Sequence, residues 1–126
     1  MNNKLKKLPE TELELMMCLW DAGKSVQRNY FNTEMPEKGW SDSTILTLLS
    51  RLQEKGFITS ENSGNKNIYT AVISKDEYMK IENKSFLSRL HKGSVKHFIA
   101  SLVDSDNLSS EDIEELEALL KQLKEK

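Results

Sequence analysis

Short hydroxyl side chains and one arginine recur at helical spacing between residues 41 and 55. At 100° per residue, Ser43, Thr47 and Ser50 fall on one side of such a helix, and Thr44 and Arg51 flank it. Hydroxyl groups hydrogen-bond to phosphates and base edges, and an arginine pairs with a phosphate or with the two acceptors of guanine. The pattern therefore predicts a helix that reads the major groove of double-stranded DNA. An ordinary solvated helix face is the alternative. The candidate contacts on this helix are Ser41, Ser43, Thr44, Thr47 and Arg51.

Four other side chains bear on this prediction. Leu46 lies at the other margin of the helix and, if exposed, would meet a thymine methyl group. Asp42 and Glu54 count against DNA contact because carboxylates repel phosphates. Lys66, in a polar turn cluster at 62–66, is predicted to be a second cationic contact outside the helix.

The elements around this helix must hold it against a core. Ile45, Leu48, Leu49 and Leu52 form the apolar stripe of the helix, Ser41 is its expected N-cap, and Gly56 stops it. Apolar spacing predicts an earlier helix over residues 10–20, and its predicted apolar stripe is Leu13, Met16, Met17 and Trp20. A short helix over residues 26–34 is predicted to begin at an N-cap, Ser25.

Two β-prone segments, 57–60 and 67–73, flank the turn at 62–66 and predict a hairpin. Three short helices followed by a hairpin describe a winged helix-turn-helix domain. The expected fold is mainly α with a small β-hairpin, and residues 1–73 are the expected DNA-binding domain.

Residues 74–126 are predicted to form three helices, over residues 74–92, 94–103 and 109–124. The first has a capping box formed by Ser74 and Glu77. So many apolar side chains on so short a segment favour a two-fold homodimer, with 74–126 as its dimerisation domain. Packing of these helices back onto their own winged helix is the alternative. The predicted interface residues are Phe86, Leu90, Phe98, Ile99, Leu102, Ile113, Leu116, Leu119, Leu120 and Leu123.

The net charge of the chain does not by itself indicate nucleic-acid binding. The chain has 18 Lys and Arg against 20 Asp and Glu, and the acidic excess lies in residues 74–126. DNA binding must therefore come from the arrangement of the charges. A winged helix that docks to a protein and does not read DNA is thus a second hypothesis.

Catalytic and metal sites are not expected. His91 and His97 are six residues apart, which does not put both on one helix face, and they are interpreted as solvated. Cys18 lacks a second cysteine for a zinc site or a disulfide. We expect neither enzymatic activity nor a cofactor. Without a signal peptide or an apolar stretch long enough to span a bilayer, we expect a cytoplasmic protein with no membrane insertion.

Three segments resemble the penicillinase-repressor family, which includes methicillin-resistance regulators and copper-responsive repressors. They are ELELM with Trp20 (residues 12–16 and 20), WSDSTILTLLSRLQEKGFI (40–58) and NLSSEDIEEL (107–116). The resemblance covers nearly the whole chain. It implies a dimeric repressor on a two-fold symmetric operator, with the contacts on residues 41–51 and Lys66 named above. At Asp42, Ser43 and Leu46 the chain departs from a family pattern that is more cationic.

The family resemblance has two further implications. Penicillinase repressors are cut by a membrane-bound sensor protease at an Asn-Phe bond, and the matching bond in this chain is Ser101-Leu102. Copper-responsive relatives carry a C-terminal cysteine cluster, whereas this chain has Cys18 alone. Copper sensing of that type is therefore not expected.

Overall fold

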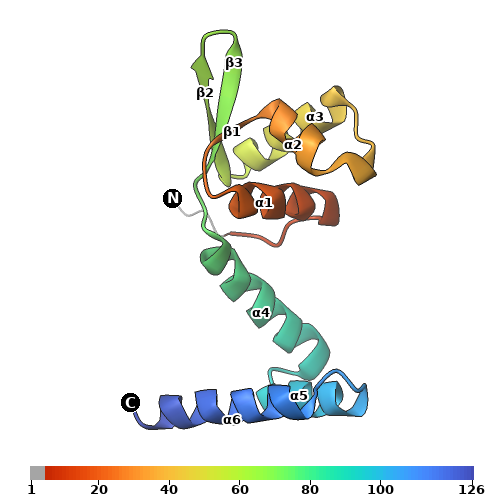
Figure 1. The fold of residues 1–126 in the computed structure, drawn as a ribbon, viewed down its shortest axis with the longest axis vertical. Coiled ribbons are helices and arrows are strands. Elements are labelled where there is room, and N and C mark those ends of the chain that lie inside the picture. The colour runs from red at the N-terminus through yellow and green to blue at the C-terminus, as the bar shows by residue number, and fades with distance from the viewer. Residues whose placement is uncertain (1–4) are drawn as a thin grey trace. The chain divides into compact units, whose positions relative to one another are not determined.

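The structure, a computed structural model, describes residues 5–126 and divides into two units. The first unit contains three α-helices, a short 3-10 helix and a three-stranded sheet, and it ends within a fourth α-helix. A hairpin formed by β2 (Ile58–Ser63) and β3 (Lys66–Ala71) projects beyond the helices of this unit (Figure 1). The prediction of a mainly α-helical fold with a small β-hairpin is confirmed. The elements are α1 (Glu10–Ala22), β1 (Val26–Gln27), α2 (Arg28–Glu34), the 3-10 helix η1 (Pro36–Lys38), α3 (Asp42–Glu54), β2 (Ile58–Ser63) and β3 (Lys66–Ala71).

Helix α3 begins and ends where the sequence predicts. The Ser41 hydroxyl accepts a hydrogen bond from the Thr44 backbone N–H at 3.2 Å, as an N-cap does. Gly56, with φ of 82°, takes the left-handed conformation directly after Lys55, which glycine adopts without a steric penalty. The four predicted stripe residues, Ile45, Leu48, Leu49 and Leu52, are all buried.

The predicted stripe of α1 is wrong by about one residue. Leu15, Met16 and Leu19 are buried in the core, whereas Leu13, Met17 and Trp20 are only half-buried. Residues 13–20 are mostly apolar, so two overlapping stripes satisfy helical spacing. The elements that pack against α1 select between them. Trp20 lies at the margin, where its Nε1 donates to the carbonyl of Ile73 at 2.8 Å.

The start of the second helix also differs from the prediction. Residues 26–27 form strand β1, which pairs antiparallel with β3 so that Val26 lies opposite Tyr69. Helix α2 begins only at Arg28, and the Ser25 hydroxyl lies 2.7 Å from that of Thr70 instead of capping a helix. Two residues are too few for a sequence pattern, so this strand depends on its distant partner.

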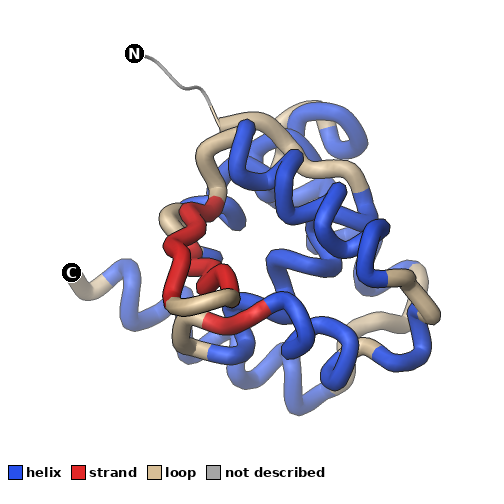
Figure 2. Tube along the Cα trace, turned by 90° about the horizontal axis from the view of Figure 1, so that it is seen from above, coloured by secondary structure: helices blue, strands red, loops and turns tan. Residues whose placement is uncertain are grey.

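The sheet has the order β1-β3-β2, and its strands lie together in Figure 2. Ser63 pairs with Lys66, which leaves a two-residue turn at Gly64 and Asn65, with φ of 68° at Gly64. The strands therefore extend further than the predicted loop at 62–66 allowed. Lys66 is the first residue of β3 and not part of a loop.

Helix α4 (Lys75–His91) leads from the first unit, which ends at Glu82, into the second, Asn83–Lys126. The second unit also contains α5 (Val95–Asp104) and α6 (Ser110–Lys124). The capping box at Ser74 is confirmed, since its hydroxyl accepts from the Glu77 N–H at 3.1 Å. The assignment of residues 1–73 and 74–126 to DNA-binding and dimerisation domains stays a prediction. Within residues 5–126, no helix has both the length and the apolar composition needed to cross a membrane.

Candidate nucleic-acid interface

Helix α3 separates its side chains into a buried and an exposed face. The leucine stripe packs into the core of the first unit, against α1 and the sheet. The predicted contacts Ser41, Ser43, Thr44, Thr47 and Arg51 are all exposed. The structure thus brings these five residues together on the solvent-facing side of α3, whose opposite side packs into the core.

Several of these hydroxyls already make hydrogen bonds within the helix. The Ser41 hydroxyl donates to Thr44 Oγ1 at 3.0 Å and lies 3.3 Å from Ser43 Oγ. The Thr47 hydroxyl donates to the backbone carbonyl of Ser43 at 2.9 Å. A hydroxyl oxygen that donates its own proton can still accept a hydrogen bond. These bonds restrict the rotation of the side chains and so preorganise the face.

Arg28 is a functional candidate that the sequence reasoning missed. Its Nη1 lies 2.7 Å from Asp42 Oδ1 and donates to Asn32 Oδ1 at 2.7 Å. Asn32 Nδ2 in turn donates to the same carboxylate oxygen of Asp42 at 3.3 Å. The carboxylate at the start of α3 is therefore paired with a cation from α2. This pairing weakens the objection that Asp42 repels phosphate.

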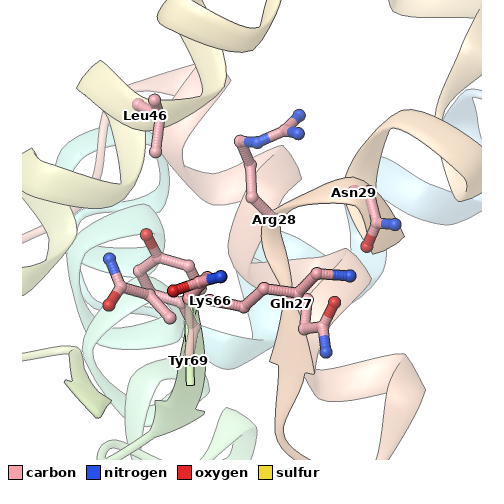
Figure 3. Close-up of a pocket in the computed structure, with 8 residues that line it drawn as sticks. Gln27, Arg28, Asn29, Leu46, Lys66 and Tyr69 are labelled. Carbon is pink, nitrogen blue, oxygen red and sulfur yellow. The ribbon is translucent and has the colours of Figure 1, made fainter. Parts of the chain in front are cut away.

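An open groove of about 290 Å³ lies beside α3 and includes both Arg28 and Lys66 (Figure 3). The start of α2, one residue of α3 and the tip of the hairpin border it. Two of its lining residues, Leu46 and Tyr69, are apolar or aromatic, and Arg28 and Lys66 are cationic. The other four carry side-chain amides: Gln27, Asn29, Asn65 and Asn67. Such a lining suits a phosphate backbone, because it offers positive charge and neutral donors together.

The side chains predicted to form a dimer interface lie in α4, α5 and α6. Half of them are partly buried within the second unit: Phe86, Phe98, Ile99, Leu102 and Leu116. The other half are exposed: Leu90, Ile113, Leu119, Leu120 and Leu123. Neither α5 nor α6 contains a buried residue, so in a single copy none of the apolar side chains of these two helices is fully covered.

The interpretation of His91 as a solvated histidine is wrong. The His91 ring is 8% exposed and packs against Phe86 and Phe98, with ring centroids 5.0 and 5.2 Å away. Its Nδ1 lies 2.8 Å from Nδ1 of His97, which is exposed. The left-handed residues Lys92 and Gly93 turn the chain between α4 and α5, and this turn brings the two rings together.

The predicted cleavage bond lies inside a helix. Ser101 and Leu102 are half-buried in α5, and the Ser101 hydroxyl donates to the carbonyl of Phe98 at 2.7 Å. Proteolysis between them therefore requires α5 to unwind locally.

Neither a reactive thiol nor a metal cluster is found in the part of the chain that the structure describes. Burial, together with the nearby carboxylates of Glu34, Asp21 and Glu37, raises the pKa of Cys18 to about 11. The thiol is thus protonated near neutral pH and a poor nucleophile or ligand. No three His, Cys, Asp or Glu side chains of residues 5–126 gather as a metal site would require.

Known proteins resemble this chain along most of its length. A family model described as penicillinase repressor matches residues 8–122. The penicillinase repressor of Bacillus licheniformis is 31% identical over 122 residues, which is 96% of this chain and 94% of that protein. The methicillin resistance regulatory protein MecI of Staphylococcus aureus (strain N315) is 28% identical over 120 residues, with 95% and 98% covered.

A solved structure shares the fold of part of the chain. The solution structure of the DNA binding domain of the repressor BlaI is similar with a TM-score of 0.52 and 31% sequence identity. The similarity covers 61% of this chain and 94% of that one. A winged-helix unit is thus common to both.

Proposed function

Because the chain belongs to the penicillinase repressor family, we propose that it is a DNA-binding transcriptional repressor that acts as a homodimer on a two-fold symmetric operator. One observation carries the proposal: α3 buries its apolar stripe, Ile45, Leu48, Leu49 and Leu52, and exposes its hydroxyls and Arg51. A helix that enters the major groove needs one apolar face packed against its own domain and one polar face directed at the DNA. Repression requires only that the operator be occupied, so this function needs no bond chemistry.

In this proposal the contacts divide by position on the unit. Ser43 and Thr47, in the middle of the exposed face, reach base edges in the major groove. Ser41, Thr44 and Arg51 contact the flanking backbone. Lys66, on the hairpin, binds a phosphate across the groove beside α3.

The homodimer rests on the exposed apolar side chains of the C-terminal helices. Leu119, Leu120 and Leu123 are each more than half exposed along one helix, α6. Burying such surface against a second copy is favourable by about 25 cal/mol per Å². Dimerisation also offsets the low positive charge, because two linked units double the phosphate contacts and raise the effective concentration at the second half-site.

The link between the two DNA-binding units in the proposed dimer suggests how repression would end. We propose that a membrane sensor protease cuts between Ser101 and Leu102 after α5 unwinds. The cut would separate α6 from the rest of the chain, and with it most of the exposed apolar residues that join the two copies. Each winged helix would then bind its half-site alone and dissociate readily. A chain truncated after Ser101 that still bound a full operator as tightly as the intact chain would contradict this step.

Selection of bound sequences from random duplex DNA tests the function as a whole. We expect a palindromic consensus, and affinity for it that falls steeply as salt rises because bound counterions are released. Replacing Arg51 with alanine should weaken binding, whereas replacing the exposed Lys75 at the start of α4 should not. A protein-docking winged helix would instead enrich no sequence and show no preference among duplexes.

A further inference from the structure

Leu46 is exposed although it lies on a helix whose other leucines are buried. It is 45% exposed, whereas Leu48, Leu49 and Leu52 are at most 5% exposed. Helical spacing puts Leu46 one turn from Ser43 and Ser50, next to the hydroxyl face. An apolar side chain exposed beside a polar face is available for contact, and covering it with an apolar group of a partner is favourable.

The surroundings of Leu46 indicate which kind of partner covers it. Leu46 lines the groove that also contains Arg28 and Lys66, and Figure 3 shows these side chains around the same open space. None of the residues that line this groove carries a carboxylate, and the nearby carboxylate of Asp42 is paired with Arg28. An apolar protein surface would bury the charge of Lys66 without offering it a partner. A DNA groove supplies phosphates for the cations and one apolar group for the leucine.

That apolar group is the 5-methyl group of thymine, which projects into the major groove, where neither cytosine nor guanine nor adenine carries a methyl group. We propose that Leu46 recognises a 5-methylpyrimidine, thymine in ordinary DNA, at one position of each half-site. Because Ser43 and Ser50 lie one turn away on the same helix, methyl recognition and hydrogen bonding would fall on neighbouring base pairs. The inference rests on the proposed function and adds the base chemistry that this site selects.

The test uses the full-length chain and the duplex recovered by selection from random DNA. Each thymine is replaced in turn by deoxyuridine, which keeps every hydrogen-bonding group and lacks only the methyl group. We expect one position in each half-site where the replacement weakens binding about fourfold, as burial of one methyl group implies, and about fifteenfold when both half-sites are changed.

The variant Leu46→Ala isolates the side chain. It should bind the thymine duplex as weakly as the wild-type chain binds the deoxyuridine duplex, and it should no longer distinguish the two. Its thermal unfolding should match that of the wild type, because Leu46 lies outside the core. Val72→Ala is the matched control, since Val72 is 53% exposed after β3 and does not line the groove. It should keep the full thymine preference.

Three results would overturn the assignment, and they separate the role of Leu46 from DNA recognition as a whole. Tight, sequence-specific binding with equal affinities for thymine and deoxyuridine at every position, or a preserved thymine preference in Leu46→Ala, would contradict the role of Leu46 alone. Failure to enrich any duplex would contradict both this role and DNA recognition itself.

Discussion

The guanidinium of Arg28 and the carboxylate of Asp42 form an ion pair, with Nη1 and Oδ1 2.7 Å apart, between the first residue of α2 and the first residue of α3. Asn32 hydrogen-bonds to both partners. The pair joins α3, which is proposed to enter the major groove, to α2. It also offsets the negative charge of Asp42 at the N-terminal end of α3, where most of the predicted contacts lie.

Breaking this pair should change DNA affinity in opposite directions. Arg28→Ala leaves the Asp42 carboxylate facing the phosphates and should weaken binding, whereas Asp42→Asn frees the cation and should strengthen it, each by roughly threefold to tenfold at low salt. The double variant should lie between them. Fluorescence anisotropy over a salt series measures this, and both effects should shrink as salt rises. Unchanged affinity in both single variants would show that the pair lies away from the DNA.

The exposed side of α6 should control oligomeric state. Leu120→Glu puts a charge among apolar side chains and should convert the proposed dimer to a monomer in sedimentation equilibrium. Its affinity for a full operator should fall, while its affinity for a half-site duplex stays the same, because the winged helix is intact. Lys121→Glu, an exposed charge reversal on the same helix, is the control and should remain dimeric. Dimers of Leu120→Glu would rule out this surface.

Tyr78 should make stability depend on pH in the alkaline range. Its hydroxyl oxygen accepts from the Leu8 N–H at 2.7 Å and its hydroxyl donates to Glu82 Oε2 at 2.5 Å. Burial, followed by the hydrogen bond to Glu82, raises the pKa of Tyr78 from 10.0 to about 12. The unfolded chain therefore loses this proton first as pH rises. The contribution to stability is complete below pH 10 and is lost between pH 10 and about 12.

The variant Tyr78→Phe tests that contribution. Loss of the hydroxyl leaves the Leu8 N–H without its partner and should lower the free energy of unfolding by about 1–3 kcal/mol near neutral pH. Urea denaturation at several pH values should show the difference between wild type and variant shrinking above pH 10. A constant difference up to pH 12 would argue against the raised pKa.

Lys55 should be needed for stability although it is exposed. Its Nζ contacts Oε1 of Glu12, a carboxylate on α1 that is 2% exposed. Lys55→Met leaves that buried carboxylate unpaired and should lower the free energy of unfolding by about 1–3 kcal/mol. Lys24→Met, at an exposed position next to α1, should change it by less than about 0.5 kcal/mol. Adding Glu12→Gln to Lys55→Met should restore part of the loss, as urea denaturation would show.

The sequence predicted α3 well because its signals are local. A capping serine, a four-residue apolar stripe and a terminal glycine all lie within the helix or next to it, and each acts through neighbours one turn away. The same is true of the capping box at Ser74. The exposed positions of Ser43, Thr47 and Arg51 follow from this periodicity without knowledge of any other element.

Tertiary structure decided what depends on residues distant in the chain. Strand β1 exists because Val26 meets Tyr69, His91 is buried because the chain turns back after α4, and α1 buries Leu15 rather than Leu13 because of what packs against it. The pairing of Arg28 with Asp42 likewise required the relative placement of two helices. A single helix or strand carries its own periodicity, but charge pairing and burial are properties of two surfaces brought together. For this reason the sequence alone identified the helix that is proposed to face the DNA, and only the fold revealed which charges lie beside it and that Leu46 is exposed.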